Sequence, residues 1–276
     1  ILCGTEVSSS QVSRLGKELD KEVSAWRALP LGQIQYLVLD ATYESVREDA
    51  SVVKQALLVA IGVDYNGNRH ILDTAVAGSE AEINWRNFLE GLIRRGMHGL
   101  QMITSDDHVG LRAAINAVFP GILWQGCQFH LQQNARAYVS RKDDIPVVTN
   151  DIRKVFNAPD RENAERYLKQ LVDKYQKTNP RLAAWADENI REGLSVFSIP
   201  QNHRRKLRTS NLAERQMKEI NRRTKVVGVF PNADSLLRLA ASMLIEQNDQ
   251  WQSEKRYLPE SDDRPALTEI YRKGVA

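Results

Sequence analysis

ALLVAIGVDYNGNRHILDTAVAG, residues 56–78, holds two apolar runs separated by an Asn-Gly turn. The runs, 56–64 and 70–78, have the length and the β-branched content of strands. Asn-Gly strongly favours a tight β-hairpin, because both residues readily adopt the positive φ angles that such turns require. This stretch therefore predicts an antiparallel hairpin within a sheet.

Further elements are predicted on both sides of the hairpin. YLVLD, 36–40, LQMIT, 100–104, and GILWQGC, 121–127, are short apolar runs of the kind found in buried strands. Apolar residues repeat at helical spacing over 85–93 and 111–119. The order strand, hairpin, helix, strand, helix, strand predicts an α/β fold with a mixed five-stranded sheet and helices on both faces.

The rest of the chain is predicted to be helical. Residues 8–29 read as a helix capped by serines, either a plain packing helix or part of a helix-turn-helix. No convincing strand occurs between residues 129 and 202. We divide the chain into an N-terminal helical segment, a first core part, an all-helical insertion and a second core part, at 1–30, 31–128, 129–202 and 203–276.

Composition excludes several classes of protein. The 276 residues are 42% hydrophobic and 26% charged, as in soluble globular proteins. We expect no signal peptide, because ILCGTEVSSS lacks a basic region and a long apolar run, and no apolar run approaches the roughly 20 residues of a membrane span. Cys3 and Cys127 suggest no disulfide scaffold, so we expect a cytoplasmic protein. Because the chain starts without methionine, we expect a fragment of a longer protein.

Positive charge is concentrated in one stretch. Net charge is +3, but residues 203–225 carry nine Lys and Arg against two Glu, or +7 (9 − 2). Such a block is usually a solvated surface, and a nucleic-acid contact is the minority interpretation. The candidate DNA contacts are Arg204, Arg205, Lys206, Arg208, Arg215, Arg222, Arg223 and Lys225.

Two aspartates follow predicted strands. Asp40 ends the run 36–40, and Asp106 follows the run 100–104. If these strands are parallel neighbours, both carboxyls emerge at one sheet edge, where ligands bind in open α/β sheets. Mg²⁺ or Mn²⁺ would relieve their repulsion. The plain alternative is turn residues, with Asp106 and Asp107 capping the next helix.

A third acid would complete a two-metal site, and Glu214 is the best candidate. It could instead form a capping box with Asn211, and Glu219 is predicted to pair with Arg223.

Other candidate ligands are weaker. Cys127 and His130 have metal-ligand spacing, but a structural zinc site needs four ligands and no second such pair exists. His108 fits a surface or helix-start residue better than a catalytic base. We predict a core position for Trp185 rather than base stacking.

Five stretches occur in one order and together resemble the Mutator-type transposases of bacterial insertion sequences: YLVLDATY, ALLVAIGVDYNGNRHIL, TSDDHVGL, CQFHLQQN and TSNLAERQMKEINRRTKVVGVFPN. The resemblance covers nearly the whole chain, and the last stretch is the most specific. It implies an RNase H-like core with a DDE triad at Asp40, Asp106 and Glu214, and a helical insertion before the third acid. Cys127 and His130 match a Cys/Asp-x-x-His signature of the family, and with His108 we predict them to support the active site.

Two departures from the family pattern stand out. Most of the family's N-terminal DNA-binding region is expected to be missing, and SDDH has an acid at Asp107 where the family often has a small residue. The implied function is DNA cleavage and strand transfer by a homodimer, without a membrane, using two Mg²⁺ or Mn²⁺ ions per active site. A metal-dependent nuclease that cuts without joining and a non-catalytic DNA-binding relative remain open alternatives.

Overall fold

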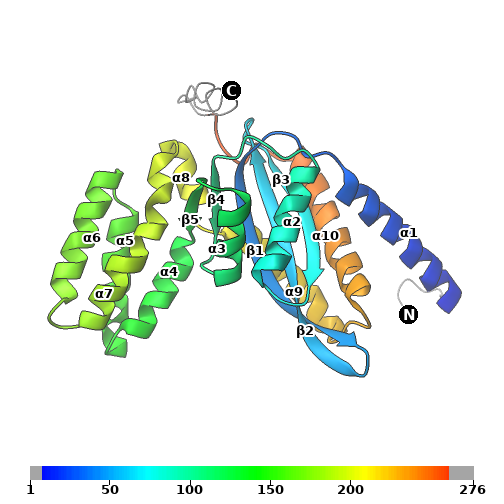
Figure 1. The fold of residues 1–276 in the computed structure, drawn as a ribbon, viewed down its shortest axis with the longest axis horizontal. Helices are drawn as coiled ribbons and strands as arrows, with labels where there is room; N and C mark the ends of the chain where they lie inside the picture. Colours follow the sequence, from blue (N-terminus) through cyan, green and yellow to red (C-terminus); the bar gives the residue numbers. More distant parts are fainter. Residues whose placement is uncertain (1–7, 261–276) are drawn as a thin grey trace.

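A mixed five-stranded sheet forms the centre of the computed structural model, which describes residues 8–260 (Figure 1). Its strands follow the order β3-β2-β1-β4-β5, and only β2 runs against the others. The mixed sheet predicted from the sequence is confirmed. The strands are β1 (Ile34–Glu48), β2 (Ser51–Asp64), β3 (Arg69–Ala77), β4 (Met102–Ser105) and β5 (Leu123–Gly126).

The predicted Asn-Gly hairpin joins β2 to β3, with Val63 paired to Arg69. Gly67 has a φ of 80°, and a Cβ there would lie 2.3 Å from the carbonyl oxygen of Leu258. The sequence did not predict a second hairpin, between β1 and β2, which turns at Asp49 with a φ of 50°. Both its arms run past the apolar cores of the strands into polar residues, so the hydrophobic pattern did not show it.

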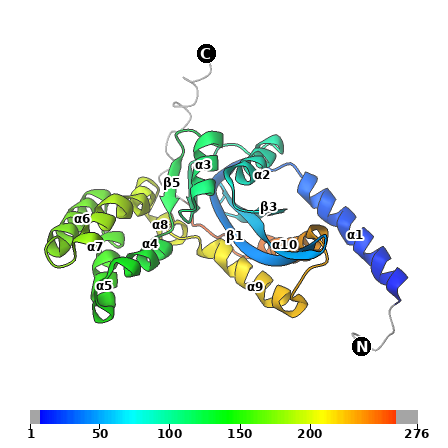
Figure 2. The ribbon, with the colours of Figure 1, turned by 60° about the horizontal axis from the view of Figure 1, so that its bottom comes forward.

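Helices cover both faces of the sheet (Figure 2). On one face, α2 (Glu82–Arg94) and α3 (Val109–Val118) pack on Leu37 and Leu39. On the other face, α9 (Asn211–Val227) and α10 (Ala233–Ser253) pack on Val38 and on residues of β2. The layers follow from the alternation of apolar side chains along the central strands.

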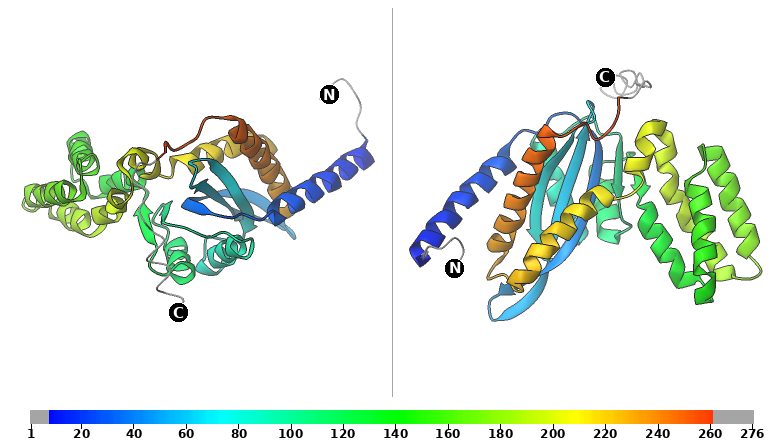
Figure 3. Two further views of the ribbon diagram at one scale, coloured as in Figure 1. Left: turned by 90° about the horizontal axis from the view of Figure 1, so that it is seen from above. Right: turned by 180° about the vertical axis from the view of Figure 1, so that it is seen from behind.

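Residues 128–207, the helical segment, lie beyond the β5 edge (Figure 3). Residues 131–194 form a separate apolar core, whereas Val196, Ile199 and Leu207 pack with Tyr36 and Met102 of the sheet. Trp185 is buried in that core and stacks on Tyr138, with ring centroids 5.3 Å apart, so the predicted core position is confirmed. The α-helices of the segment are α4 (Gln128–Ala135), α5 (Ile145–Phe156), α6 (Arg161–Tyr175), α7 (Pro180–Asn189) and α8 (Gln201–Leu207).

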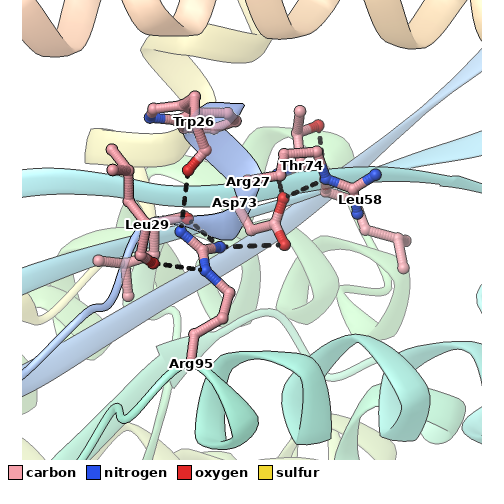
Figure 4. Close-up of polar contacts among 8 residues, drawn as sticks. Trp26, Arg27, Leu29, Leu58, Asp73, Thr74 and Arg95 are labelled. Atoms are coloured by element: carbon pink, nitrogen blue, oxygen red, sulfur yellow. Dashed lines mark hydrogen bonds and ion pairs between the residues drawn. The ribbon is translucent and has the colours of Figure 1, made fainter. Parts of the chain in front are cut away.

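The predicted N-terminal helix is α1 (Ser9–Ala28), capped by Ser8. Its end is fixed to the sheet by a buried charge network (Figure 4). Asp73 of β3 accepts a hydrogen bond from Arg27 and forms an ion pair with Arg95, which also donates to the Trp26 carbonyl.

Within residues 8–260, no helix is both long and apolar enough to cross a membrane. Cys3, and residues 261–276 of the predicted second core part, lie outside the described residues.

Candidate active site

The parallel pairing of β1 and β4 sets Asp40 beside Asp106. The register pairs Val38 with Thr104, so two residues further along each chain the two aspartates lie opposite each other. Because side chains alternate across a strand, Asp40 points to the same face as Val38, which α9 and α10 cover.

Asp40 does not end its strand, contrary to the sequence prediction. β1 continues to Glu48, because β2 supplies backbone partners along its whole length. What ends is the pairing of β1 with β4, whose last residue is Ser105. The aspartates therefore lie at the predicted position, where β4 ends, although β1, which carries Asp40, continues beyond it.

The start of α9 brings Glu214 to this edge. The Thr104 hydroxyl donates to the Leu207 carbonyl at 2.8 Å, which ties the end of α8 to β4. Ser210 then precedes α9, and its hydroxyl donates to Glu214 Oε1 at 2.9 Å. These contacts hold the third acid against the ends of the sheet strands, although it lies more than 100 residues from Asp106 in the sequence.

Asp106 and Glu214 both act electrostatically on Asp40. Burial raises the pKa of Asp40 to about 7, with further increases from Asp106 and Glu214 and partial relief from the Ala41 N–H and His130. Burial likewise raises the pKa of Asp106. In the part of the chain that the structure describes, no lysine or arginine forms an ion pair with any of the three.

Cys127 and His130 are also neighbours of Glu214. Cys127 Sγ and His130 Nε2 are each 4.0 Å from Glu214 Oε1, and the Ser210 N–H donates to the sulfur at 3.4 Å. A hydrogen bond with Cys127 raises the pKa of His130 to about 9. Burial pushes the pKa of the Cys127 thiol upward, but hydrogen bonds from His130 and Ser210 outweigh it and leave that pKa below its ordinary value. The pair thus favours the imidazolium form of His130 and shifts the Cys127 thiol toward ionisation.

The capping alternatives for the second acid are absent. The residue that precedes α3 is His108, and no side chain caps that helix. Asp107 instead pairs with Arg112 at 3.1 Å on the surface. Of the two adjacent acids, Asp106 is therefore the one directed toward Asp40 and His130.

The capping alternative for Glu214 is also wrong. Ser210, not Asn211, precedes α9, so Glu214 forms no capping box with Asn211. Glu219 pairs with Arg223 at 3.2 Å, as predicted, and also with Arg222.

Glu80 is a neighbour of the site that the sequence reasoning missed. Its carboxylate lies 3.8 Å from His108 Nδ1, and its backbone N–H donates to the Tyr43 hydroxyl. Burial, together with Asp106, raises the pKa of Glu80, although His108 opposes the shift. An acid just before a helix is too common for its sequence position to have indicated this. His108, predicted as active-site support, is 41% exposed at its side chain and lies on the Asp106 side.

Several predicted DNA contacts are occupied within the protein. Arg204 donates to three backbone carbonyls, those of Phe197, Ile199 and Pro159. Lys206 donates to the Tyr257 carbonyl.

The other predicted basic residues are more available. Arg208 donates to Asn157, and Arg222 and Arg223 share Glu219, but the two arginines on α9 are exposed. Arg205, Arg215 and Lys225 are exposed, and none of them forms an ion pair with a described residue.

The acidic side of the site fits divalent cations. Asp40, Asp106 and Glu214 offer carboxylate oxygens, which hard cations such as Mg²⁺ and Mn²⁺ prefer. Burial disfavours ionisation of Asp40 and Asp106, which have no lysine or arginine partner among the described residues, and a bound cation would reverse that preference.

The sequence matches the family described as "Transposase, Mutator family" over residues 1–254. It is 49% identical over 259 residues to the transposase for insertion sequence element IS406 of Burkholderia multivorans, covering 93% of this chain and 67% of that one. It is 38% identical over 266 residues to the transposase for ISRM5 of Rhizobium meliloti, covering 95% and 66%. The match to the transposase for IS1081 of Mycobacterium tuberculosis is 36% over 256 residues, covering 92% and 61%.

The chain spans about two thirds of the length of these curated relatives. The family match includes both strands that carry the aspartates, the helical segment and the helix that carries Glu214. On this evidence from sequence, the chain belongs to the Mutator family of transposases.

Proposed function

We propose that this chain is the catalytic part of a DDE transposase that cuts the ends of an insertion-sequence element and joins them to target DNA. The observation that carries the proposal is the buried Asp40 at the sheet edge, which has Asp106 and Glu214 as charged neighbours and no lysine or arginine ion-pair partner among the described residues. The relatives, named as transposases of insertion sequence elements, support DNA as the substrate.

In this proposal the sheet with α2, α3, α9 and α10 is an RNase H-like core. The helical segment is then an insertion between the second and third acids. Its separate apolar core supports this division, because the segment could be accommodated without rebuilding the sheet.

Asp40, Asp106 and Glu214 would hold two Mg²⁺ or Mn²⁺ ions. When bound, such ions lower the pKa of an attacking water or hydroxyl and stabilise the leaving oxygen. Ser210 orients the Glu214 carboxylate through its hydrogen bond, and His130 offsets part of the local negative charge. These neighbours keep the third acid in place before a substrate arrives.

Two displacements at phosphorus make up the proposed reaction. Water attacks the phosphorus at the element end, the bond to the 3′ oxygen breaks, and a 3′-hydroxyl is released. That hydroxyl then attacks a target phosphodiester, and the target's own 3′ oxygen leaves. Both nucleophiles come from water or DNA, so no side chain becomes covalently attached.

The exposed Arg205, Arg215, Arg222, Arg223 and Lys225 would contact DNA phosphates, because they project into solvent along α8 and α9. Such contacts give salt-dependent affinity with little sequence preference. Two element ends must be brought together, so we propose that two copies act as a homodimer.

A strand-transfer assay with labelled element-end DNA tests the proposal. Wild-type protein with Mg²⁺ should cut the end and also join a pre-cut 3′ end to target DNA, and Asp106→Asn should do neither. Asp107→Asn is the matched control, because its carboxylate pairs with Arg112 on the surface. Cutting without joining would indicate the nuclease alternative, and unchanged activity of Asp106→Asn would remove the catalytic proposal.

A further inference from the structure

Three different donor atoms meet at Glu214. Cys127 Sγ, His130 Nε2 and a carboxylate oxygen of Glu214 all lie within 4.8 Å of one another. The sequence disfavours a structural zinc site because it holds no second closely spaced Cys/His pair. The fold supplies a third ligand from α9 instead, 87 residues after Cys127.

The spacing is close to that of a coordination sphere. Zinc bonds of about 2.3 Å to sulfur and about 2.0 Å to nitrogen or oxygen put tetrahedral ligand atoms roughly 3.3–3.6 Å apart. Glu214 Oε1 is 4.0 Å from both Cys127 Sγ and His130 Nε2. Moving the Glu214 oxygen closer by roughly 0.5–0.7 Å closes both gaps, and rotation of the Glu214 side chain can supply that movement.

The donor set selects the kind of metal. Thiolate and imidazole favour Zn²⁺ and similar transition metals and are poor ligands for Mg²⁺. Three protein ligands with a fourth position left to water is a coordination that zinc accepts.

The surroundings hold the ligands in place. Cys127 is 1% exposed, and its backbone N–H donates to the Ser105 carbonyl at the end of β4. The Ser210 N–H holds the sulfur. The sulfur therefore keeps its position at the site without a metal.

We propose that Cys127, His130 and Glu214 form a transition-metal site that competes with the magnesium site for Glu214. The competition, unlike the binding itself, rests on the proposed function. Glu214 Oε1 faces Cys127 and His130, and the same carboxylate acts on Asp40. A metal held by sulfur and imidazole occupies that carboxylate, and the enzyme then lacks its third acid.

Cobalt binding tests the site without DNA. Co²⁺ titrated into the full 276-residue chain carrying Cys3→Ser should give tetrahedral d–d bands and a sulfur-to-cobalt charge-transfer band, both reversed by Zn²⁺. Adding Cys127→Ser should abolish the charge-transfer band and weaken zinc binding at least about 100-fold, since loss of an outer partner alone costs about 10- to 100-fold. His130→Asn should weaken binding similarly, whereas exposed His98→Asn is the control that should not.

Absence of the charge-transfer band, or equal zinc affinity in Cys127→Ser, would overturn the site even if the transposase reaction is confirmed. Circular dichroism of each variant separates loss of a ligand from loss of the fold.

The competition has its own measurement. With Mg²⁺ present, stoichiometric Zn²⁺ should suppress cleavage by the Cys3→Ser protein, and excess Mg²⁺ should restore it. The cleavage rate of each variant with Zn²⁺ is divided by its own rate with magnesium alone. Cys127→Ser should need at least about 100-fold more Zn²⁺ for the same fractional loss of cleavage. Tight zinc binding that leaves cleavage unaffected would refute competition for Glu214. A protein inactive with magnesium alone would instead count against the proposed function.

Discussion

Two aspartates on the same sheet, Asp40 on β1 and Asp73 on β3, are buried to nearly the same extent but have opposite surroundings. Asp40 is 9% exposed and Asp73 is 5% exposed. Asp73 accepts a hydrogen bond from Arg27 at 2.8 Å, lies 3.3 Å from Arg95 and also accepts the Thr74 N–H (Figure 4). Asp40 accepts a hydrogen bond from the Ala41 N–H, and its charged neighbours are Asp106, Glu214 and His130.

The two sites differ in whether the charge of a buried acid is compensated. An ionised carboxylate is tolerated inside a protein when paired charges and hydrogen bonds replace water, as at Asp73. At Asp40 the neighbouring acids add to the cost of ionisation, which lowers stability unless a cation is bound. Burial of an acid is therefore a weak sign of function, and burial without a counter-charge is a stronger one.

The largest expected effect tests this contrast through activity. Asp40→Asn should lower magnesium-dependent cleavage by about 10³-fold or more, because it removes a proposed metal ligand that acts as a unit with the other two acids. Asp73→Asn should leave cleavage per folded molecule nearly unchanged. A gel assay of element-end cleavage measures both, and equal losses in the two variants would erase the distinction.

The free energy of unfolding should show the reverse order, with the larger loss on substitution of Asp73. Asp73→Ala leaves Arg27 and Arg95 without their shared carboxylate and should lower the free energy of unfolding by about 3–5 kcal/mol. Arg27 is 34% exposed at its side chain, so the lower end of that range is expected. Urea unfolding of metal-free protein gives the value. A loss below about 1 kcal/mol, the size expected of an exposed pair, would show that the network does not anchor α1.

The pH dependence sharpens the contrast further. The folded pKa of Asp40, about 7, lies above its ordinary 3.8, so ionisation lowers stability increasingly as pH rises between these values. Asp40→Asn should therefore change the metal-free protein little near about pH 4 and stabilise it by about 1–3 kcal/mol near about pH 8, within the limit of roughly 4 kcal/mol set by the shift.

Urea unfolding in a chelator at both pH values checks this. A stabilisation that is the same at low and high pH would mean that Asp40 is not held with a raised pKa.

The smallest effects concern the basic residues. Arg205→Ala and Lys225→Ala should each reduce the salt dependence of DNA binding by about 0.9 in the slope of log affinity against log salt, if each contacts one phosphate. Arg204 donates to three backbone carbonyls. Arg204→Ala should therefore mainly lower the stability of the fold and should change the salt slope less than Arg205→Ala does. Fluorescence anisotropy at several salt concentrations measures the slopes. A larger change in slope for Arg204→Ala than for Arg205→Ala would show that Arg204, not Arg205, contacts phosphate.

Much of the fold could be predicted because local signals agree with the tertiary structure. The Asn-Gly turn, the apolar runs and the helical spacing each coincide with an element of the sheet or its covering helices. The β1–β2 hairpin could not be predicted, because its polar outer arms pair through their backbones and leave no hydrophobic pattern.

Short stretches of sequence are enough to specify which elements form and which side chains are acids, since propensity, periodicity and ionisable groups are local properties. Which acids become neighbours depends on the folded chain as a whole. The β1–β4 register and the hydrogen bonds of the α8–α9 link bring Glu214 to the aspartates and to Cys127 and His130. The same tertiary contacts compensate Asp73 and leave Asp40 uncompensated, because electrostatic energy depends on distance in space and on burial, and separation along the chain specifies neither.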